Sequence, residues 1–230
     1  MKNVFKNKKR KVIISGIFFA FLILGVSFYY FPKWLKSYRM RTHFYNADKK
    51  LDSITEEKVI ENIKGQCDKI RKSAGKLYSP REIETAIKNS DGKNKIRLVG
   101  REEASKKGYL ALNIEGKDVE LFCFDFGERV VIEGRGKIEI GFADFHDIDG
   151  NALSLTGGEG KIHHSKFTNS SKAGIFSDQG KWEIYGNIIK NNHSYGIYGG
   201  YEADLDLYEN AIIDNSGYEV RMLGEKEVYN

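Results

Sequence analysis

The 230-residue sequence is poor in four residue types, with two prolines, two cysteines, two tryptophans and three methionines. Two cysteines are too few for a disulfide framework, and neither has the spacing of a metal-ligand set. Acidic residues are missing from one stretch, since residues 1–41 carry ten basic side chains and no acid. These scarcities exclude a disulfide-stapled scaffold and a cysteine-bound zinc fold, and they single out the N-terminal region.

One long apolar segment, Val12–Pro32, contains no charged residue from end to end. As a helix rising 1.5 Å per residue it covers the roughly 30 Å hydrocarbon core of a bilayer. A cleaved signal peptide has an apolar stretch of only about 7–15 residues and small residues before its cleavage site. This segment instead ends in aromatic residues, which suit the headgroup interface. The sequence therefore predicts a transmembrane anchor helix in contact with the lipid bilayer, with a cleaved leader as the alternative.

Charges on the two flanks predict how this anchor is oriented. Residues 1–11 carry six cations and residues 33–41 carry four. The denser cluster stays cytoplasmic, which places the C-terminal domain on the extracytoplasmic side. The rest of the chain has 27 basic and 32 acidic residues, so the overall charge of +5 belongs to the membrane flanks. We therefore predict no nucleic-acid partner.

Two short helices are predicted in the juxtamembrane segment, residues 33–93. Ser53-Ile-Thr-Glu56 is a capping box before apolar residues at helical spacing, and Gly75 ends that helix. Ser79-Pro80-Arg81-Glu82 is a second capping box, with proline at the first helical position.

The two cysteines fall in apolar patterns. Cys67 lies on the apolar face of the first predicted helix, and Cys123 alternates with Val119 and Leu121. Both are expected to be small buried hydrophobes. A disulfide between them outside the cell is the alternative.

The last ninety residues repeat with a period of 22 or 23. Three apolar columns and one polar column keep this register: Ile140, Ile162, Ile184 and Leu207; Phe145, Phe167, Ile189 and Ile212; Leu153, Ile175, Ile197 and Val220; Asp147, Asn169, Asn191 and Asp214. One coil of this length cannot bury its inward face, but stacked coils can, because each strand pairs with its equivalent one coil away. Asn and Asp tolerate the left-handed backbone of tight corners.

The segment Asn187–Ile197 resembles the N-x-I-x-x-N-x-x-x-G-I repeat of right-handed parallel β-helices. That pectate-lyase-like superfamily includes carbohydrate-binding and sugar-hydrolase repeat domains. The resemblance is good over residues 137–223 and weaker over 94–136. It implies a mainly β fold, a right-handed parallel β-helix solenoid of about six coils over 94–230, with the helix at 79–89 as the amphipathic cap of its N-terminal end. Function must still be argued from a site.

One candidate site lies on the outward side of the second strand in each coil. Asp144 and His146 flank an inward phenylalanine, and Lys166 lies one coil further on. Lyases and epimerases of the superfamily remove a proton next to a uronate carboxylate, which implies His146 as the base and Lys166 as the neutralising cation. The favoured alternative is a charge-paired ladder of Asp144 and Lys166 without catalysis.

Two clusters contain metal-ligand residue types. Asp147, Asp149 and Asn169 gather oxygen atoms that suit calcium, although the corners of a solenoid gather such residues without any metal. His163 and His164 are adjacent in a strand and are expected to point to opposite faces, so they do not share a metal. We predict no metal and no cofactor.

Aromatic residues form two outward columns, His163, Tyr185 and Tyr208 on one strand and Phe176 and Tyr198 on another. Aromatic rings stack against the faces of sugars, so both columns are predicted glycan-binding residues. Ordinary cross-strand packing is the alternative.

The last coil ends near Leu223 and is followed by Gly-Glu-Lys-Glu-Val-Tyr-Asn, with no evident cap. An open solenoid end exposes unpaired strand edges. Either this charged tail covers the edges, or a partner protein or a second copy does.

Two functions compete at this point. The leading one is a non-catalytic module outside the membrane that binds a cell-envelope or environmental polysaccharide, or a protein partner. The alternative is a polysaccharide lyase, epimerase or hydrolase. A role in copper-enzyme maturation, as for the periplasmic nitrous-oxide reductase maturation protein of this superfamily, rests on fold analogy alone.

Overall fold

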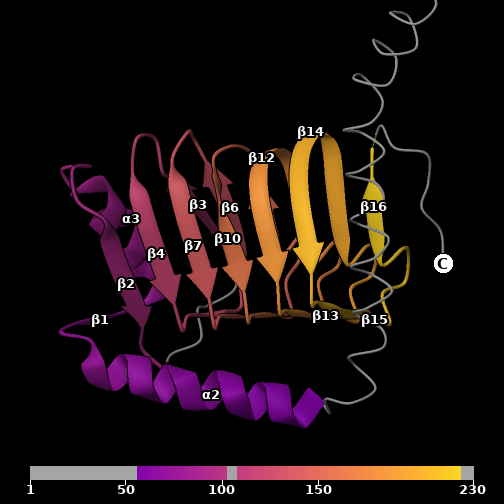
Figure 1. The fold of residues 1–230 in the computed structure, drawn as a ribbon, viewed down its shortest axis with the longest axis horizontal. Helices are drawn as coiled ribbons and strands as arrows, with labels where there is room; N and C mark the ends of the chain where they lie inside the picture. Colours follow the sequence, from indigo (N-terminus) through magenta and orange to yellow (C-terminus); the bar gives the residue numbers. More distant parts are fainter. Residues whose placement is uncertain (1–55, 103–107, 224–230) are drawn as a thin grey trace, which may run out of the picture. The chain divides into compact units, whose positions relative to one another are not determined.

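The computed structural model describes residues 56–102 and 108–223, which form two helices and sixteen strands. The helices are α2 (Glu56–Ser73) and α3 (Pro80–Lys88). Every strand pairs in parallel with a strand from a neighbouring coil, so the chain winds into a solenoid of about six turns. Figure 1 shows the strands of one face side by side, with α3 at the first coil and α2 along the edge of the coils.

The solenoid has three faces, which we call A, B and C. Face A contains β1 (Leu77–Tyr78), β2 (Ile96–Gly100), β4 (Asp118–Phe122), β7 (Lys137–Gly141), β10 (Glu159–His163) and the second halves of β12 (Ile175–Tyr185) and β14 (Ile197–Tyr208). Face B contains β5 (Asp125–Phe126), β8 (Asp144–His146), β11 (Lys166–Thr168), β13 (Ile188–Lys190) and β15 (Ala211–Ile213). Face C contains β3 (Tyr109–Asn113), β6 (Arg129–Glu133), β9 (Leu153–Leu155), the first halves of β12 and β14, and β16 (Val220–Met222).

The predicted columns are confirmed as the register of these faces. Ile162 pairs with Ile140 and Ile184 on face A, and Phe167 pairs with Phe145 and Ile189 on face B. The side chains of these residues are fully buried. Phenylalanine rings of neighbouring coils stack at 4.5 Å for Phe145 and Phe167. The core is therefore a set of apolar columns that run along the solenoid axis, as the repeat predicts.

The polar column also lies where its residue types predict. Asp147, Asn169, Asn191 and Asp214 all have φ between 55° and 57°. This left-handed backbone turns the chain from face B toward face C, and Asn and Asp adopt it at lower cost than most residues. The repeated polar column is thus a conformational feature of the corner.

Helix α3 closes the first coil. The carboxylate of Glu82 accepts hydrogen bonds from the backbone N–H and the hydroxyl of Ser79, as the second capping box predicts. Ile83 and Ile87 point into the solenoid and join its core cluster. The predicted amphipathic cap is confirmed, since its apolar side replaces a preceding coil. The capping box at 53–56 lies outside the described residues, apart from the start of α2 at Glu56.

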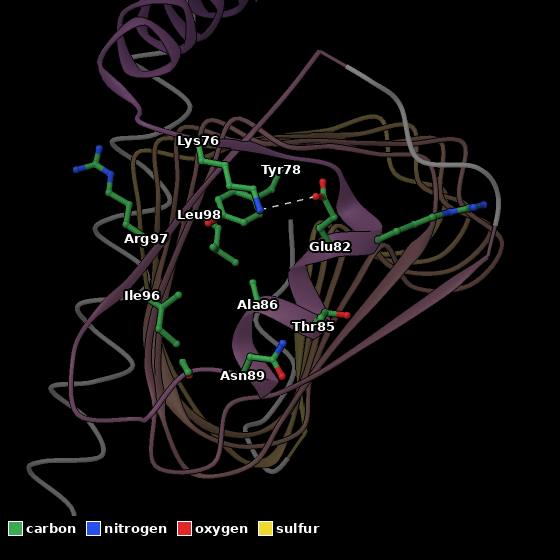
Figure 2. A pocket seen from close by; sticks show the side chains of 11 residues that line it. Lys76, Tyr78, Glu82, Thr85, Ala86, Asn89, Ile96, Arg97 and Leu98 are labelled. Carbon is green, nitrogen blue, oxygen red and sulfur yellow. Dashed lines mark ion pairs between the residues drawn. The ribbon is translucent and has the colours of Figure 1, made fainter.

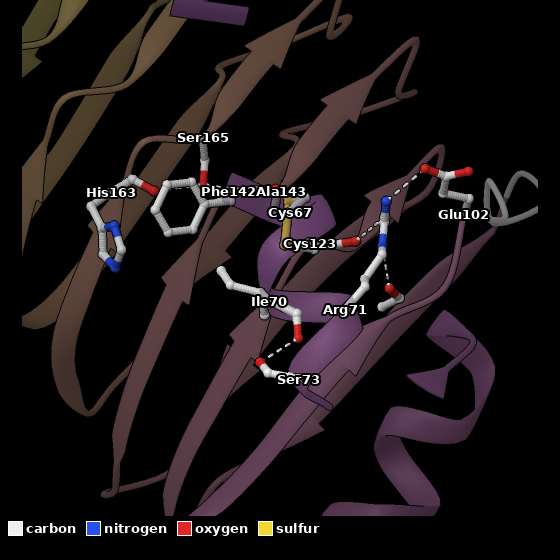
Figure 3. The surroundings of a disulfide bond; sticks show 11 residues. Cys67, Ile70, Arg71, Ser73, Glu102, Cys123, Phe142, Ala143, His163 and Ser165 are labelled. Carbon is white, nitrogen blue, oxygen red and sulfur yellow. Dashed lines mark hydrogen bonds and ion pairs between the residues drawn. A yellow bond between two sulfur atoms is a disulfide. The ribbon is translucent and has the colours of Figure 1, made fainter. Parts of the chain in front are cut away.

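Both cysteines are buried as expected, but they are not free thiols: Cys67 and Cys123 form the disulfide of the alternative, with their Cα atoms 5.5 Å apart. Cys123 does not continue the inward alternation of β4. It follows the strand with φ 62°, which turns its side chain out of the core toward α2. There it packs with Phe122 and Cys67 in a second small cluster. Figure 3 shows this bond beside Arg71, whose guanidinium donates to the carbonyl oxygens of Gly100 (2.8 Å) and Cys123 (2.9 Å).

The predicted anchor and C-terminal tail are not tested. Val12–Pro32 and residues 224–230 lie outside the described residues, and among the helices that are described none is long and apolar enough to cross a membrane. The last strands of the described solenoid are the second half of β14 on face A, β15 on face B and β16 on face C.

Candidate functional site

The predicted catalytic residues lie together on the outward side of face B. Asp144 and Lys166 occupy equivalent positions on β8 and β11, and their side chains form an ion pair at 3.3 Å. The Nε2 atom of His146 lies 2.8 Å from Asp125, and its Nδ1 atom lies 3.1 Å from Asp147. The ion pair of the charge-ladder alternative is therefore present, and both imidazole nitrogens already have a carboxylate partner.

Neighbouring carboxylates occupy both ring nitrogens of His146 and shift its pKa. Partial burial lowers the pKa of His146, but the hydrogen bonds to Asp147 and Asp125 and the charges of Asp125 and Asp144 outweigh it, so the pKa is raised. Because each ring nitrogen lies within hydrogen-bond distance of a carboxylate, neither is free to accept a proton from a substrate without losing that contact. The geometry therefore weakens the predicted role of His146.

Asp144 is the more unusual group of this cluster. Its Oδ1 atom is buried without a hydrogen-bond partner, although 42% of the whole side chain is exposed. Burial raises the pKa of Asp144 against the opposing charges of Lys166 and His146. A carboxyl group with a raised pKa beside a second carboxylate is a feature shared by many acid–base sites.

That second carboxylate, Asp125, does not emerge from the sequence pattern. It pairs in register with Asp144 on the neighbouring strand. The step along the chain from Asp125 to Asp144 is shorter than the step from Asp144 to its next partner, Lys166. The sequence would reveal Asp125 only if the coil that contains β5 were allowed to be shorter than the later coils.

The first aromatic column forms a stacked ladder on face A. The rings of Tyr185 and Tyr208 lie 4.8 Å apart and 4° from parallel, and His163 stacks on Tyr185 at 5.2 Å. The faces of Tyr185 are thus covered by its two neighbours. Cross-strand packing is present, and a sugar would meet the edge and hydroxyl of Tyr185 rather than its ring face.

The sequence predicts His163 as an exposed member of this ladder, but in the structure the residue is buried. Only 6% of its surface is accessible, because its ring packs against Phe122 and Phe142. The residue in register before it is Gly141, where a Cβ atom would come within 2.6 Å of the imidazole. A glycine there leaves the space that the His163 ring fills, so we exclude His163 from direct ligand contact.

A row of charged side chains runs beside the ladder. In strand order it consists of Arg97, Glu120, Glu139, Lys161, Glu183 and Asp206. Lys161 and Glu183 form an ion pair at 2.9 Å, and Nε2 of His163 lies 3.0 Å from Glu139. Glu183 also accepts a hydrogen bond from the hydroxyl of Tyr208, and this bond with that of Lys161 lowers the pKa of Glu183. Face A therefore presents tyrosine hydroxyls and ionised groups in adjacent rows.

The second aromatic column lies on face C. Phe176 and Tyr198 are half-buried and stack at 5.6 Å and 16° from parallel. Tyr195 packs against Tyr198, and the guanidinium of Arg221 donates to the hydroxyl of Tyr195. This second column is shorter than the first, and Arg221 continues it on β16.

The candidate metal clusters make hydrogen bonds within the protein. The Asn169 amide donates to Asp147 (3.0 Å) and the Ser171 hydroxyl donates to Asp149 (2.9 Å), each across one coil. No group of three or more His, Cys, Asp or Glu side chains suited to a metal occurs among the residues described.

The geometry expected for the adjacent histidines is wrong. Strand β10 ends at His163, and His164 has φ 48°, which brings its ring back to the same side. The two Nδ1 atoms lie 3.0 Å apart, and the His164 ring also stacks on Phe142. Burial, and then the nearby His163, lower the pKa of His164.

These three faces of stacked parallel strands define a β-solenoid, and the comparisons with known proteins are consistent with it. Residues 127–228 match the family model described as a right handed beta helix region. Together with the fold, this match supports the right-handed β-helix superfamily. No curated protein and no solved structure matches the chain significantly.

Proposed function

We propose that this chain is a non-catalytic glycan-binding module held on the outer side of a membrane. One observation carries the proposal, namely the ladder of Tyr185 and Tyr208 beside the charged row of Lys161, Glu183 and Asp206 on face A. Strands of one sheet lie about 4.8 Å apart, so equivalent groups recur at that spacing along the axis. A repeated polar surface of this kind suits a polymer with repeated hydroxyl groups.

The mode of contact follows from the ladder geometry. Because the ring faces of Tyr185 are covered, binding depends on hydrogen bonds from hydroxyls and charged groups, with ring edges as the apolar part. Hydrogen bonds to charged groups contribute roughly 1.5–3 kcal/mol each, about twice the value for neutral pairs. Glu183 and Lys161 are therefore the strongest candidates for contacts with sugar hydroxyls.

Placement outside a membrane has support from two directions. Disulfides persist in oxidising compartments, so the Cys67–Cys123 bond favours an extracytoplasmic location. The charge asymmetry about the predicted anchor Val12–Pro32 favours the same orientation.

A glycan array with the full chain in detergent tests this function. We expect Tyr185→Ala and Glu183→Gln to abolish binding to a glycan that the unaltered protein retains. Tyr109→Ala is the matched control, because Tyr109 is 57% exposed and lies on face C away from the ladder. Loss on Tyr198→Ala but not on Tyr185→Ala would move the site to face C. Failure to bind any glycan on the array would overturn the proposal.

Glycan cleavage is the second candidate function, and Asp144 is the observation that favours it. Asp125 and Asp144 lie side by side on paired strands, and Asp144 has a raised pKa. Hydrolases of glycosides use two such carboxyl groups, one of them protonated. Release of reducing ends that Asp144→Asn and Asp125→Asn both abolish would establish it. If both variants still released these products, Asp125 and Asp144 would be excluded as the catalytic pair.

A further inference from the structure

The first coil has an open strand edge next to the cap. Strand β2 pairs with β4 along Ile96–Val99, but on its other side β1 pairs only with Val99 and Gly100. Among the residues that the structure describes, no strand pairs with Ile96–Leu98 on that side. Unpaired strand edges are templates for the addition of another strand.

Backbone geometry shows which groups this edge offers. The N–H and C=O of one strand residue point to the same side, and successive residues alternate. The N–H of Arg101 donates to the carbonyl of Tyr78 on β1, so alternate residues before it, Val99 and Arg97, present their backbone groups to that side too. Arg97 therefore offers one donor and one acceptor to an added strand.

A hollow of about 480 Å³ lies between this edge and α3. Figure 2 shows Ile96 and Leu98 pointing into it from β2, opposite Ala86 on α3, while Arg97 points away from the cap. A second hollow, of about 250 Å³, shares Lys76, Tyr78 and Arg97 with the first and extends to Ile70 and Ala74 at the end of α2. A strand laid along β2 would thus have an apolar side toward Ala86 and a polar side toward Arg97.

The charged residues around the hollow indicate which kind of segment would bind there. Its lining includes three cations, Lys76, Arg81 and Arg97, and one carboxylate, Glu82. That carboxylate accepts hydrogen bonds from Ser79 and from Arg101 at 2.6 Å, and it also pairs with Lys76 at 4.0 Å. Arg97 pairs with Glu120 on the neighbouring strand at 3.7 Å. The lining still contains more cations than carboxylates, and this excess favours an acidic segment.

We propose that the hollow between β2 and α3 is a docking groove for an extended acidic peptide of a partner protein, which adds to β2 as a short strand. The open edge spans three residues, or about 10 Å at 3.3 Å per residue. Alternate apolar side chains of the peptide enter the hollow, and the acidic side chains between them meet Arg97 on the outer side of β2. This mode is β-strand addition, in which backbone hydrogen bonds supply affinity and side-chain pockets supply specificity. It is independent of the glycan surface on the middle and last coils of face A.

Fluorescence anisotropy with labelled, end-blocked peptides tests this proposal on the full chain. The probe is Val-Glu-Val-Glu-Val, and Val-Lys-Val-Lys-Val is its charge-reversed control. Two further versions are N-methylated, one at residues 1, 3 and 5 and the other at residues 2 and 4. We expect only one of these two to lose binding, because only one set of amides faces β2. Equal binding by both versions would show that no strand is added and would overturn the proposal.

Protein variants supply the second arm of the experiment. Arg97→Glu is expected to weaken binding of the acidic peptide about tenfold, the effect of losing one charged contact. Ala86→Phe fills the hollow and is expected to have a similar effect. The matched control is Lys88→Glu, an exposed cation of α3 that does not line the hollow. Thermal unfolding of each variant confirms that it folds. Equal weakening by Arg97→Glu and Lys88→Glu, or no binding at millimolar peptide, would refute the groove.

Discussion

Two neighbouring asparagines show how single residues hold a corner of the solenoid. Asn191 is exposed with φ 56°, and Asn192 is fully buried. The Asn192 side chain donates to Asn215 (2.9 Å) and to the carbonyl of Phe167 (3.3 Å), and it accepts from the Ser170 N–H (3.0 Å). The first residue supplies a backbone conformation and the second joins three coils.

Substitutions at these two residues should change the free energy of unfolding by different amounts. Asn192→Ala removes the acceptor of the buried Ser170 N–H and the amide donor to Phe167 and Asn215, and should cost about 3 kcal/mol. Asn191→Val should cost about 1–2 kcal/mol through left-handed strain, while Asn191→Gly should be nearly neutral. Urea unfolding of the three variants measures these free energies. A cost for Asn191→Gly equal to that of Asn191→Val would show that the side chain, rather than the backbone angle, matters at this corner.

Two histidines should contribute to the pH dependence of stability with opposite sign. The pKa of His146 is raised above its usual value of 6.5, so its stabilising contribution is complete below pH 6.5 and is lost as pH rises through the folded-state pKa. The pKa of His164 is lowered, so its contribution is present above pH 6.5 and is lost as pH falls through the folded-state pKa.

Single substitutions separate these contributions. The stability difference between the unaltered protein and His146→Gln should shrink as pH rises above 6.5. The corresponding difference for His164→Gln should shrink as pH falls below 6.5. Unfolding free energies measured from pH 5 to pH 8.5 test both slopes, and a slope of the same sign for the two variants would contradict the assigned partners.

At the scale of elements, α2 depends on few attachments. It lies against the corner between faces A and B through the disulfide, the small cluster around Phe122, and the hydrogen bonds of Arg71. The disulfide joins residues 56 positions apart. Cross-links that close loops of this length stabilise a fold by about 4 kcal/mol in the chain-entropy account.

Loss of the disulfide should therefore release α2 before the solenoid unfolds. In Cys67→Ser/Cys123→Ser we expect amide exchange to rise across α2 while β7, β10 and β12 stay protected. Addition of a reductant to the unaltered protein should reproduce this pattern and should leave the double variant unchanged. Uniform loss of protection over the whole solenoid would show that the bond supports the core directly.

At the scale of the whole molecule, the disulfide reports on the compartment. If the predicted anchor exports the solenoid, the full chain made in cells should carry an oxidised Cys67–Cys123 pair. A variant without residues 12–32 should stay in the reducing cytosol with both thiols free. Gel-shift labelling with a maleimide polymer after acid quenching measures the difference. Free thiols in the full chain would contradict the proposed location.

The fold was largely predictable because the solenoid repeats one local solution. Columns such as Phe145 and Phe167 recur at fixed spacing, and each coil contacts only its neighbours. The earlier coils were harder to predict, since the step from Glu120 to its partner Glu139 is shorter than the step from Glu139 to Lys161. Shorter coils break the sequence period without changing how the strands stack. The strand register of the earlier coils therefore follows only from the three-dimensional structure.

The candidate site was predicted in part. The pairing of Asp144 with Lys166 and the Tyr185–Tyr208 ladder follow from alternation along parallel strands. The burial of His163 did not follow, because it depends on Phe142 and Phe122, which reach the same point from neighbouring coils. The contact between His163 and His164 also depends on a backbone angle that a strand pattern does not contain.

What the sequence determined by itself is the solenoid, its cap and the residues of its corners, because these depend on periodicity, capping and left-handed propensity. Only the tertiary structure decided which polar groups meet. It joined Cys67 to Cys123, placed Asp125 beside Asp144, and left the edge of β2 open beside α3. The physical reason is that these contacts depend on coil lengths and on where a helix departs from the solenoid, and neither is periodic in the sequence.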